Sequence, residues 1–277
     1  MNLTPLDNEK TLSQNFKVCM IGLGKLGMHL CMKLLKANID ITEVVVRSRS
    51  KVTVFHNGKP INAIFSPENI SPEVNVVIIA VQDDNIARVA AQVPVAENRL
   101  VLHTSGTRPL SDLEIHPHHG ILYPLQSFSE TVVPIWEKIP ICLTPKAEDD
   151  FSRQQLENFA ALAFVQNPVY CLAEHQRKVL HLAAVFTNNF VNYMLQEAYD
   201  LCAKNEVDFA ILAPLAEETI RKAFMFNPYL MQTGPAVRHD RKTMDFHQQL
   251  LIENGINPTL YQYLSEAIMA AHKNDDV

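Results

Sequence analysis

The chain lacks features that would each identify a broad class of protein. It has no block of basic residues, and 24 Lys and Arg against 30 Asp and Glu leave a formal net charge of −6. This balance disfavours nucleic acid as the main partner, because binding to phosphates requires clustered cations. The 277 residues contain no uninterrupted apolar run of about 18 residues, the length that a membrane-spanning helix needs. We therefore expect neither nucleic-acid nor membrane binding.

Targeting signals and cysteine motifs are missing as well. The segment 1–16 is polar and contains no apolar signal-peptide core. Five cysteines are scattered and never form a Cys-x-x-Cys pair: Cys19, Cys31, Cys142, Cys171 and Cys202. This usage is typical of reduced thiols in a cytoplasmic protein. By contrast, 47% of the residues are hydrophobic and 19% are charged, which is ample for a packed core and excludes bulk disorder.

The first half of the chain alternates strands with helices. A short apolar run at 16–21 predicts a buried parallel strand, and it leads directly into a glycine-containing segment at 22–27. Leucines then recur every four residues, as on one apolar face of a helix: Leu26, Leu30 and Leu34. The run 41–46 predicts a second strand. Together these segments form the strand–glycine turn–helix–strand unit that a dinucleotide site requires.

Two further strands are expected at 74–81 and 100–103. The intervening stretch 51–65 alternates around Asn57-Gly58, a strong turn signal. We interpret it as a β-hairpin or an irregular excursion, in a place where a doubly wound fold would usually have a crossover helix.

The second half of the chain is helical. Helices are expected over five segments: 152–162, 174–204, 214–226, 240–253 and 258–272. The charged run 146–150 marks a boundary. We therefore predict an α/β protein with a doubly wound, mostly parallel sheet domain for dinucleotide binding at 1–147. An all-helical domain for substrate binding and dimerisation follows at 148–277.

The candidate cofactor-binding turn is Gly22-Leu23-Gly24-Lys25-Leu26-Gly27. Gly22 permits a tight turn, Gly24 lets a pyrophosphate approach the backbone, and Gly27 lets helix and strand pack closely. The start of the helix adds free N–H groups and a partial positive charge. The alternative interpretation is an ordinary tight turn without a ligand.

The residues after the second strand favour NADP over NAD. An NAD site usually has Asp or Glu there, to accept hydrogen bonds from the ribose hydroxyls. This chain has Arg47, Ser48 and Arg49 instead. Guanidinium and hydroxyl groups bind a 2′-phosphate, which a carboxylate would repel. We predict NADP (NADPH) as the cofactor; the alternative is a solvated basic turn.

The ends of the later strands supply further candidates. The backbone at Ala80 and Val81 should line the cofactor crevice, because ligands bind at the carboxyl ends of such strands. Three polar residues before Gly106 either face the nicotinamide or form an ordinary turn: His103, Thr104 and Ser105. Either Asp83 or Asp84 is interpreted first as the N-cap of the next helix.

Two other polar clusters follow. His116, His118 and His119 lie in a loop with no Cys or carboxylate close in sequence, so we expect no metal site. Tyr123 and Ser127 belong to a non-periodic stretch that mixes aromatic and hydroxyl groups. They are candidates for substrate binding, although loop packing explains them as well.

Four segments together resemble a known family: KVCMIGLGKLGMHL, HTSG, YPLQSFS and TGPAVRHDRKT. Over residues 16–270 the chain resembles Rossmann-like NAD(P)-binding oxidoreductases with a C-terminal helical domain of unknown function. That family is similar to pyrroline-5-carboxylate reductases, ketopantoate reductases and β-hydroxyacid dehydrogenases. The resemblance implies NAD(P)-linked redox chemistry and a homodimer formed through the helical domain. The Asn57-Gly58 hairpin departs from the family pattern.

The proton-transfer residue does not follow from that pattern. β-Hydroxyacid dehydrogenases have a Lys with an Asn one helical turn later, whereas Lys178 is followed there by Leu182. His181, Asn188 and Asn192 are spaced to share one helical face. His181 is the first catalytic candidate because an imidazole titrates near neutrality, with Asn188 orienting the substrate or the ring. The alternative is a hydrogen-bonded core histidine.

Arg238 could bind a substrate carboxylate or a partner subunit, and the nearby Asp240 is a plausible N-cap. We predict an NADP-dependent oxidoreductase that transfers hydride between the nicotinamide and a small, carboxylated substrate at the domain junction. It is expected to assemble as a homodimer through its C-terminal helices. Two alternatives stay open: a non-catalytic NADP-binding redox sensor or scaffold, and an NADP reductase whose hydride partner is a deazaflavin.

Overall fold

The structure, a computed structural model, describes residues 15–46, 55–56 and 59–273. The chain divides into two compact units, residues 1–188 (unit 1) and 189–277 (unit 2). The predicted domain boundary at 147/148 lies inside unit 1, in the connection between strand β9 (Ile141–Pro145) and helix α3 (Asp150–Ala163). Strand β10 (Val169–Cys171) follows α3 and pairs with β9, so the sheet continues beyond that position.

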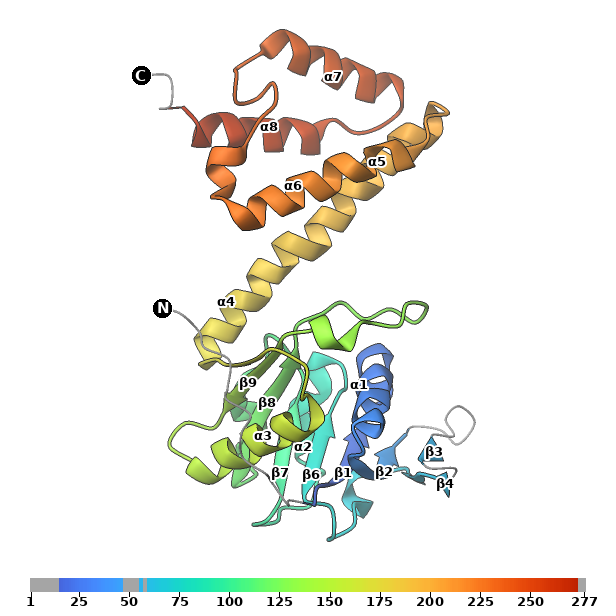
Figure 1. Cartoon of the computed structure of the whole chain (residues 1–277), viewed down its shortest axis with the longest axis vertical. Coiled ribbons are helices and arrows are strands. Elements are labelled where there is room, and N and C mark those ends of the chain that lie inside the picture. The colour runs from blue at the N-terminus through green and yellow to red at the C-terminus, as the bar shows by residue number, and fades with distance from the viewer. Residues whose placement is uncertain (1–14, 47–54, 57–58, 274–277) are drawn as a thin grey trace. The chain divides into compact units, whose positions relative to one another are not determined.

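Within the described residues, unit 1 contains an eight-stranded sheet, a separate hairpin and the covering helices (Figure 1). The remaining strands are β1 (Lys17–Ile21), β2 (Asp40–Val45), β3 (Phe55–His56), β4 (Lys59–Pro60), β5 (Asn62–Ile64), β6 (Val76–Ile79), β7 (Leu100–His103) and β8 (His118–Pro124). The other α-helices are α1 (Lys25–Lys36), α2 (Ile86–Ala90) and α4 (Glu174–Ala184). Short 3₁₀ turns lie at Pro67–Asn69, Asp83–Asn85, Leu110–Leu113 and Trp136–Lys138.

The sheet has the doubly wound order that the alternating strands and helices predict. Its strands follow one another as β10-β9-β8-β7-β6-β1-β2-β5, and neighbours are parallel except β8 and β9. From β5 to β8 this is the strand order of a dinucleotide-binding Rossmann fold. The order reverses between β1 and β6, where Ile21 pairs with Ile79. Ligands of such folds bind beyond the carboxyl ends of the strands at this reversal.

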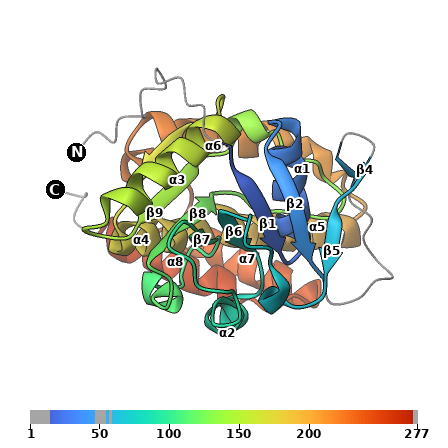
Figure 2. The same cartoon turned by 90° about the horizontal axis from the view of Figure 1, so that it is seen from below.

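The core explains why these apolar runs form central strands. Successive side chains of a strand point to opposite faces, and both faces of this sheet are buried. Met20, Leu30 and Phe159 belong to one apolar cluster, which joins β1 to α1 and α3. Ile21 and Ile86 belong to a second cluster, which joins the opposite face to α2. Figure 2 shows α1 and α3 on one side of the sheet and α2 on the other.

The predicted hairpin is present, although its turn residues Asn57 and Gly58 lie outside the described residues. Strands β3 and β4 pair antiparallel as a sheet of their own. The chain then returns to the main sheet through β5, which pairs parallel with β2. The hairpin is thus an insertion that leaves the doubly wound strand order intact.

The long helix expected over 174–204 is interrupted. After α4, residues Val185–Phe190 form a π-helix, and α5 (Val191–Lys204) follows. A π-helix bonds i to i+5 and so has a wider turn than an α-helix. The seven residues from His181 to Asn188 therefore do not correspond to two α-helical turns. The assumption of an unbroken α-helix was wrong.

Unit 2 is helical, as predicted. Besides α5 it contains α6 (Ala213–Met225), α7 (Arg241–Glu253) and α8 (Thr259–Ala271), with 3₁₀ turns at Phe209–Leu212 and Pro228–Met231. The expected N-cap is confirmed: the Asp240 carboxylate accepts hydrogen bonds from the N–H (3.1 Å) and hydroxyl (2.7 Å) of Thr243. Within the described stretches, none of the helices combines the length and the apolar character needed to cross a membrane.

Candidate functional site

The turn between β1 and α1 is shaped differently at each of its three glycines. Gly22 has a φ of +90°, which L side chains rarely adopt, and a Cβ there would lie 2.6 Å from the carbonyl oxygen of Ala80. A Cβ on Gly27 would lie 2.0 Å from the carbonyl oxygen of Gly22. A Cβ on Gly24 would meet nothing within 4 Å. Gly22 and Gly27 are therefore required by the folded turn itself, whereas Gly24 borders open space.

The open space at Gly24 has the chemistry of an anion site. Gly24 is the N-cap of the twelve-residue helix α1, no side chain caps this helix, and its first turn has no acidic residue. The free N–H groups and the positive end of the helix dipole are therefore available to an anion without a competing carboxylate. These residues fit a dinucleotide pyrophosphate, which approaches such a backbone closely.

The other predicted cofactor-binding residues near the glycine turn differ in burial and in what they contact. Leu23 and Leu26 pack against the core, while Lys25 is exposed. The Ala80 N–H donates to the carbonyl oxygen of Ile21 at 2.8 Å, and the Val81 side chain lies 3.0 Å from the position of a Cβ on Gly22. The structure therefore brings the ends of β1 and β6 together at the glycine turn.

The residues proposed for the 2′-phosphate, Arg47, Ser48 and Arg49, lie outside the described residues. The strand before them is described: Val45 at the end of β2 pairs with Ile21. The carboxyl end of β2 is thus beside the glycine turn, and the 2′-phosphate role of the basic residues stays a prediction.

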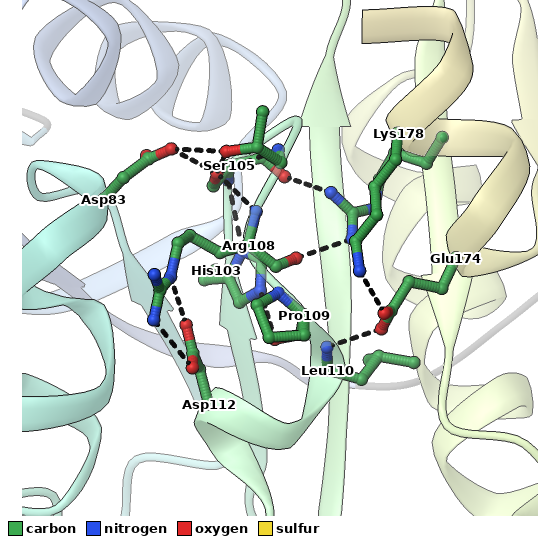
Figure 3. A network of polar contacts seen from close by, with 11 residues as sticks. Asp83, His103, Ser105, Arg108, Pro109, Leu110, Asp112, Glu174 and Lys178 are labelled. Carbon is green, nitrogen blue, oxygen red and sulfur yellow. Dashed lines mark hydrogen bonds and ion pairs between the residues drawn. The ribbon is translucent and has the colours of Figure 1, made fainter.

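Polar side chains after β7 are tied to the loop after β6 (Figure 3). Ser105 Oγ and Thr107 Oγ1 both donate to Asp83 Oδ2, each at 2.8 Å. Asp83 thus links the ends of two neighbouring parallel strands. Its interpretation as an N-cap was wrong, because the cap positions are Gln82 and Asn85.

His103 is buried and shapes the same loop. Its Nδ1 accepts a hydrogen bond from the Ser105 N–H at 3.1 Å, and its Nε2 lies 3.4 Å from the Pro109 carbonyl oxygen. Burial, reinforced by the positive charge of Arg177, lowers the pKa of His103 to about 4. The ring is therefore neutral near physiological pH, and its hydrogen bonds serve the loop.

Helix α4 is fastened to this loop by a fully buried arginine. Arg177 donates from Nη1 to the Ser105 carbonyl oxygen at 2.8 Å and from Nη2 to the Arg108 carbonyl oxygen at 2.6 Å. Burial lowers the pKa of Arg177, yet a guanidinium remains charged in proteins. Charge-assisted hydrogen bonds are stronger than neutral ones, so this fork fixes α4 relative to the loop.

Two ion pairs complete the network that Figure 3 shows. Glu174 accepts from the Leu110 N–H at 2.7 Å and pairs with Lys178 at 2.6 Å. Arg108 forms a bidentate pair with Asp112, at 2.6 and 3.0 Å. The loop after β7 is therefore held by α4 on one side and by its own 3₁₀ turn on the other.

His181, the first catalytic candidate, lies one helical turn after Arg177 and contacts the end of β8. The Tyr123 hydroxyl and His181 Nδ1 are 3.0 Å apart. Gly106 adjoins this pair: a Cβ on it would lie 2.2 Å from His181 Nδ1 and 3.0 Å from Tyr123 Cζ. The structure thus brings together one residue each from α4, β8 and the predicted nicotinamide loop.

Other predicted residues lie elsewhere. Ser127 is exposed, and its N–H donates to Gln126 Oε1. Asn188 is exposed on the π-helix. Arg238 is exposed in unit 2, before α7. In the part of the chain that the structure describes, neither Ser127 nor Asn188 is hydrogen-bonded to His181.

The three histidines at 116–119 have protein partners. Their ring nitrogens contact the Ala90 carbonyl oxygen (His116, 2.9 Å), Asp149 Oδ2 (His118, 3.0 Å) and the His116 carbonyl oxygen (His119, 2.8 Å). Across residues 15–46, 55–56 and 59–273, no group of three or more His, Cys, Asp or Glu is arranged to hold a metal ion.

Arg177, Glu174 and Thr107 were not singled out from the sequence. For Arg177 a signal existed, because a charged residue four positions before His181 lies on the same helical face. For Thr107 and Glu174 there was none, because their partners are distant in sequence.

Two family matches cover most of the chain. Residues 17–105 match the family described as NADP oxidoreductase, coenzyme F420-dependent. Residues 140–268 match a domain of unknown function, DUF2520. The first match contains the glycine turn, and the second runs from the start of β9 into α8. The predicted resemblance to NAD(P)-binding oxidoreductases with a C-terminal domain of unknown function is confirmed.

Similar solved structures include reductases. A Bacteroides fragilis protein assigned as an NADP oxidoreductase is 28% identical, with a TM-score of 0.79 over 92% of this chain and 98% of its own. Pyrroline carboxylate reductase from Plasmodium falciparum with NADP bound is 13% identical (TM-score 0.59; 93% of this chain and 98% of that one). A reductive aminase from Aspergillus terreus, in complex with NADPH4, cyclohexanone and allyl amine, is 12% identical (TM-score 0.71; 94% of both chains). The last two likenesses show the fold alone. No curated protein matches the chain.

Proposed function

Because this chain joins an NADP oxidoreductase domain to a DUF2520 domain, we propose that it transfers hydride between NADP(H) and a small, carboxylated substrate. The observation that carries this proposal is the glycine turn, where two glycines are sterically required and Gly24 alone leaves room for a ligand at an uncapped helix start. We propose that the substrate binds at the junction of the two predicted domains, 1–147 and 148–277.

We assign the cofactor to the ends of four strands, β1, β2, β6 and β7. The backbone of Gly22–Gly27 would hold the pyrophosphate, and Arg47, Ser48 and Arg49 the 2′-phosphate. Ala80, Val81 and the loop at 103–105 would line the nicotinamide side. When bound, NADPH supplies the hydride.

We assign proton transfer to His181. It lies beside Gly106 in the loop after β7 and is half-buried, so it is accessible to a substrate while held by Tyr123. Tyr123 and Ser127 would contact the substrate, and Asn188 would orient it. Arg238, which lies in unit 2, stays a candidate for carboxylate binding, because a guanidinium matches a carboxylate in two parallel hydrogen bonds.

The test is a fluorescence titration with NADPH and NADH, followed by turnover with imines, 2-oxoacids and 3-hydroxyacids. NADPH should bind more tightly than NADH, and Arg47→Ala should reduce the difference, because one of the three residues assigned to the 2′-phosphate is lost. One lost charge-assisted hydrogen bond, about 1.5–3 kcal/mol, corresponds to roughly 10- to 150-fold in affinity. Equal affinities in the wild type would contradict the 2′-phosphate assignment.

A non-catalytic NADP-binding sensor or scaffold is the second candidate. It is favoured by the absence of the Lys–Asn pair: Lys178 is paired with Glu174 instead. Tight NADPH binding without turnover of any carbonyl or imine would support this candidate.

A deazaflavin-linked reductase is the third candidate, favoured by the family that residues 17–105 match. Here the hydride partner of NADP(H) would be coenzyme F420. Bleaching of the deazaflavin absorbance on mixing with NADPH and the protein would identify this reaction.

We further propose a homodimer formed through the C-terminal helices. In unit 2, large apolar side chains are strongly exposed, including Phe224 (82%), Ile211 (70%) and Tyr263 (69%). Apolar surface of this extent marks interaction sites, and a two-fold dimer is the commonest closed arrangement.

A further inference from the structure

The Tyr123 hydroxyl has one hydrogen-bond partner within the described residues. Tyr123 is 9% exposed at the end of β8. Within the described residues, its hydroxyl is hydrogen-bonded to His181 Nδ1 at 3.0 Å and to no other group. Burial raises the pKa of the Tyr123 phenol to about 12, so the hydroxyl keeps its proton near neutrality. A buried hydroxyl that donates to nothing is costly, so this proton points to Nδ1.

This hydrogen bond determines the tautomer of the neutral His181 ring. A neutral imidazole has one donor nitrogen and one acceptor nitrogen. Because Nδ1 accepts from Tyr123, the ring proton is on Nε2. In the part of the chain that the structure describes, Nε2 has no hydrogen-bond partner, so it is the nitrogen left for a substrate.

The loop after β7 and helix α4 keep the Tyr123 hydroxyl and the His181 ring in contact. Gly106 leaves the room that Nδ1 occupies, since a Cβ there would lie only 2.2 Å from it. One turn earlier on α4, Arg177 holds the helix to the carbonyl oxygens of Ser105 and Arg108. The imidazole is therefore positioned by the loop after β7 as well as by Tyr123.

We infer that Tyr123 is a positioning residue that holds neutral His181 as its Nε2–H tautomer, so that the site takes a carbonyl rather than an iminium as reacting group. The inference rests on the proposed function. A carbonyl oxygen has lone pairs that accept a hydrogen bond from Nε2–H. An iminium nitrogen has none, and its own N–H would oppose the Nε2 proton.

The proton transfers balance along the pair. When the carbonyl carbon receives hydride, the C=O π electrons move onto oxygen, which takes the proton from His181 Nε2. Nδ1 takes the Tyr123 hydroxyl proton as Nε2 gives up its own, so the ring stays neutral. After the product leaves, water protonates Nε2 and the Nδ1 proton returns to the Tyr123 oxygen, which restores the starting tautomer. The same residues thus polarise the carbonyl and then protonate the product oxygen.

The tautomer is measured by nitrogen NMR on the full-length protein with ¹⁵N-labelled histidine at mildly alkaline pH. Loss of signals in His181→Asn identifies the ring. We expect a protonated Nε2 and an unprotonated Nδ1 in the wild type, and a mixture of both tautomers in Tyr123→Phe, which keeps the ring but not the hydroxyl. Tyr263→Phe, at an exposed position, is the control and should match the wild type. A protonated Nδ1 in the wild type, or an unchanged ratio in Tyr123→Phe, would overturn the inference.

The substrate class is tested by following NADPH oxidation with 2-oxoacids, which carry both a carbonyl and the carboxylate of the proposed substrate, each with and without allylamine. We expect the carbonyl compounds alone to support oxidation, without acceleration by the amine. Oxidation that requires the amine would overturn the carbonyl preference. If no probe supports oxidation, the proposed function fails for this substrate class, while the tautomer measurement still decides the role of Tyr123.

Discussion

A single methyl group at Gly24 should separate cofactor binding from folding. Gly24 has a φ of −71°, which alanine adopts freely, and a Cβ there would meet nothing within 4 Å. Replacing glycine by alanine reduces the conformational entropy of the unfolded chain and so stabilises the folded protein by about 0.4–1 kcal/mol. This gain offsets the lower preference for alanine at an N-cap position. We therefore expect Gly24→Ala to unfold in urea within about 1 kcal/mol of the wild type. The methyl group would occupy the space of the pyrophosphate and separate it from the N–H groups of α1.

The loss of one such charge-assisted hydrogen bond is about 1.5–3 kcal/mol, so NADPH should bind roughly 10- to 150-fold more weakly, as measured by nucleotide fluorescence. Gly22→Ala and Gly27→Ala are the matched comparisons. Their Cβ atoms would lie 2.6 and 2.0 Å from backbone carbonyl oxygens. Both variants should therefore have a lower free energy of unfolding than the wild type, whether or not NADPH is present. A stable Gly24→Ala protein with wild-type NADPH affinity would refute the assignment of the glycine turn.

Three further predictions concern stability and assembly. His103 has a folded pKa of about 4 because of burial, so the unfolded chain binds protons more readily; stability should fall by the order of 3 kcal/mol as pH drops from about 6.5 towards 4. Urea unfolding over that range should show this slope in the wild type and a smaller slope in His103→Gln, in which the buried His116 and His119, whose pKa values are also lowered by burial, remain. A flat wild-type profile would contradict the prediction. Arg177→Lys should lower the free energy of unfolding by about 1.5–3 kcal/mol, because an ammonium cannot bridge both carbonyl oxygens as the guanidinium fork does. Chemical denaturation at neutral pH measures this loss. An unchanged midpoint would show that the fork contributes nothing. Sedimentation should give twice the 31.3 kDa of one chain at micromolar concentration, and a species of monomer mass would refute the dimer.

Local patterns predicted the central part of the fold. Apolar runs predicted the strands β1, β2, β6 and β7, because strands buried on both faces need uninterrupted apolar residues. Turn chemistry predicted the hairpin around Asn57-Gly58 and the Asp240 cap of α7. The glycine motif located the turn between β1 and α1 that we propose for the cofactor, because its spacing and its flanking elements are all local in sequence.

The strands β8, β9 and β10 were not predicted. They are short or carry His, Gly and Pro, and their pairing depends on strands already in the sheet. The π-helix at 185–190 has no pattern that distinguishes it from an α-helix.

The polar network was missed for a related reason. Asp83 bonds to Ser105 and Thr107 more than twenty residues away, and Arg177 reaches Ser105 over 72 positions. Such contacts exist only once parallel strand ends and α4 have come together. The sequence therefore offered the residue types but not their pairing.

NADPH consumption by the wild type and by His181→Asn, measured at saturating NADPH with the same carbonyl and imine probes, tests the proposed oxidoreductase chemistry most directly. Asparagine keeps a polar group but does not titrate near neutrality. The wild type should consume NADPH with at least one probe, and His181→Asn should be at least about 100-fold slower, the lower bound for general acid–base catalysis. NADPH affinity should be unchanged. Equal rates in a stable His181→Asn protein would remove His181 from the chemistry, and a wild type that binds NADPH but consumes it with no probe would contradict the enzymatic function.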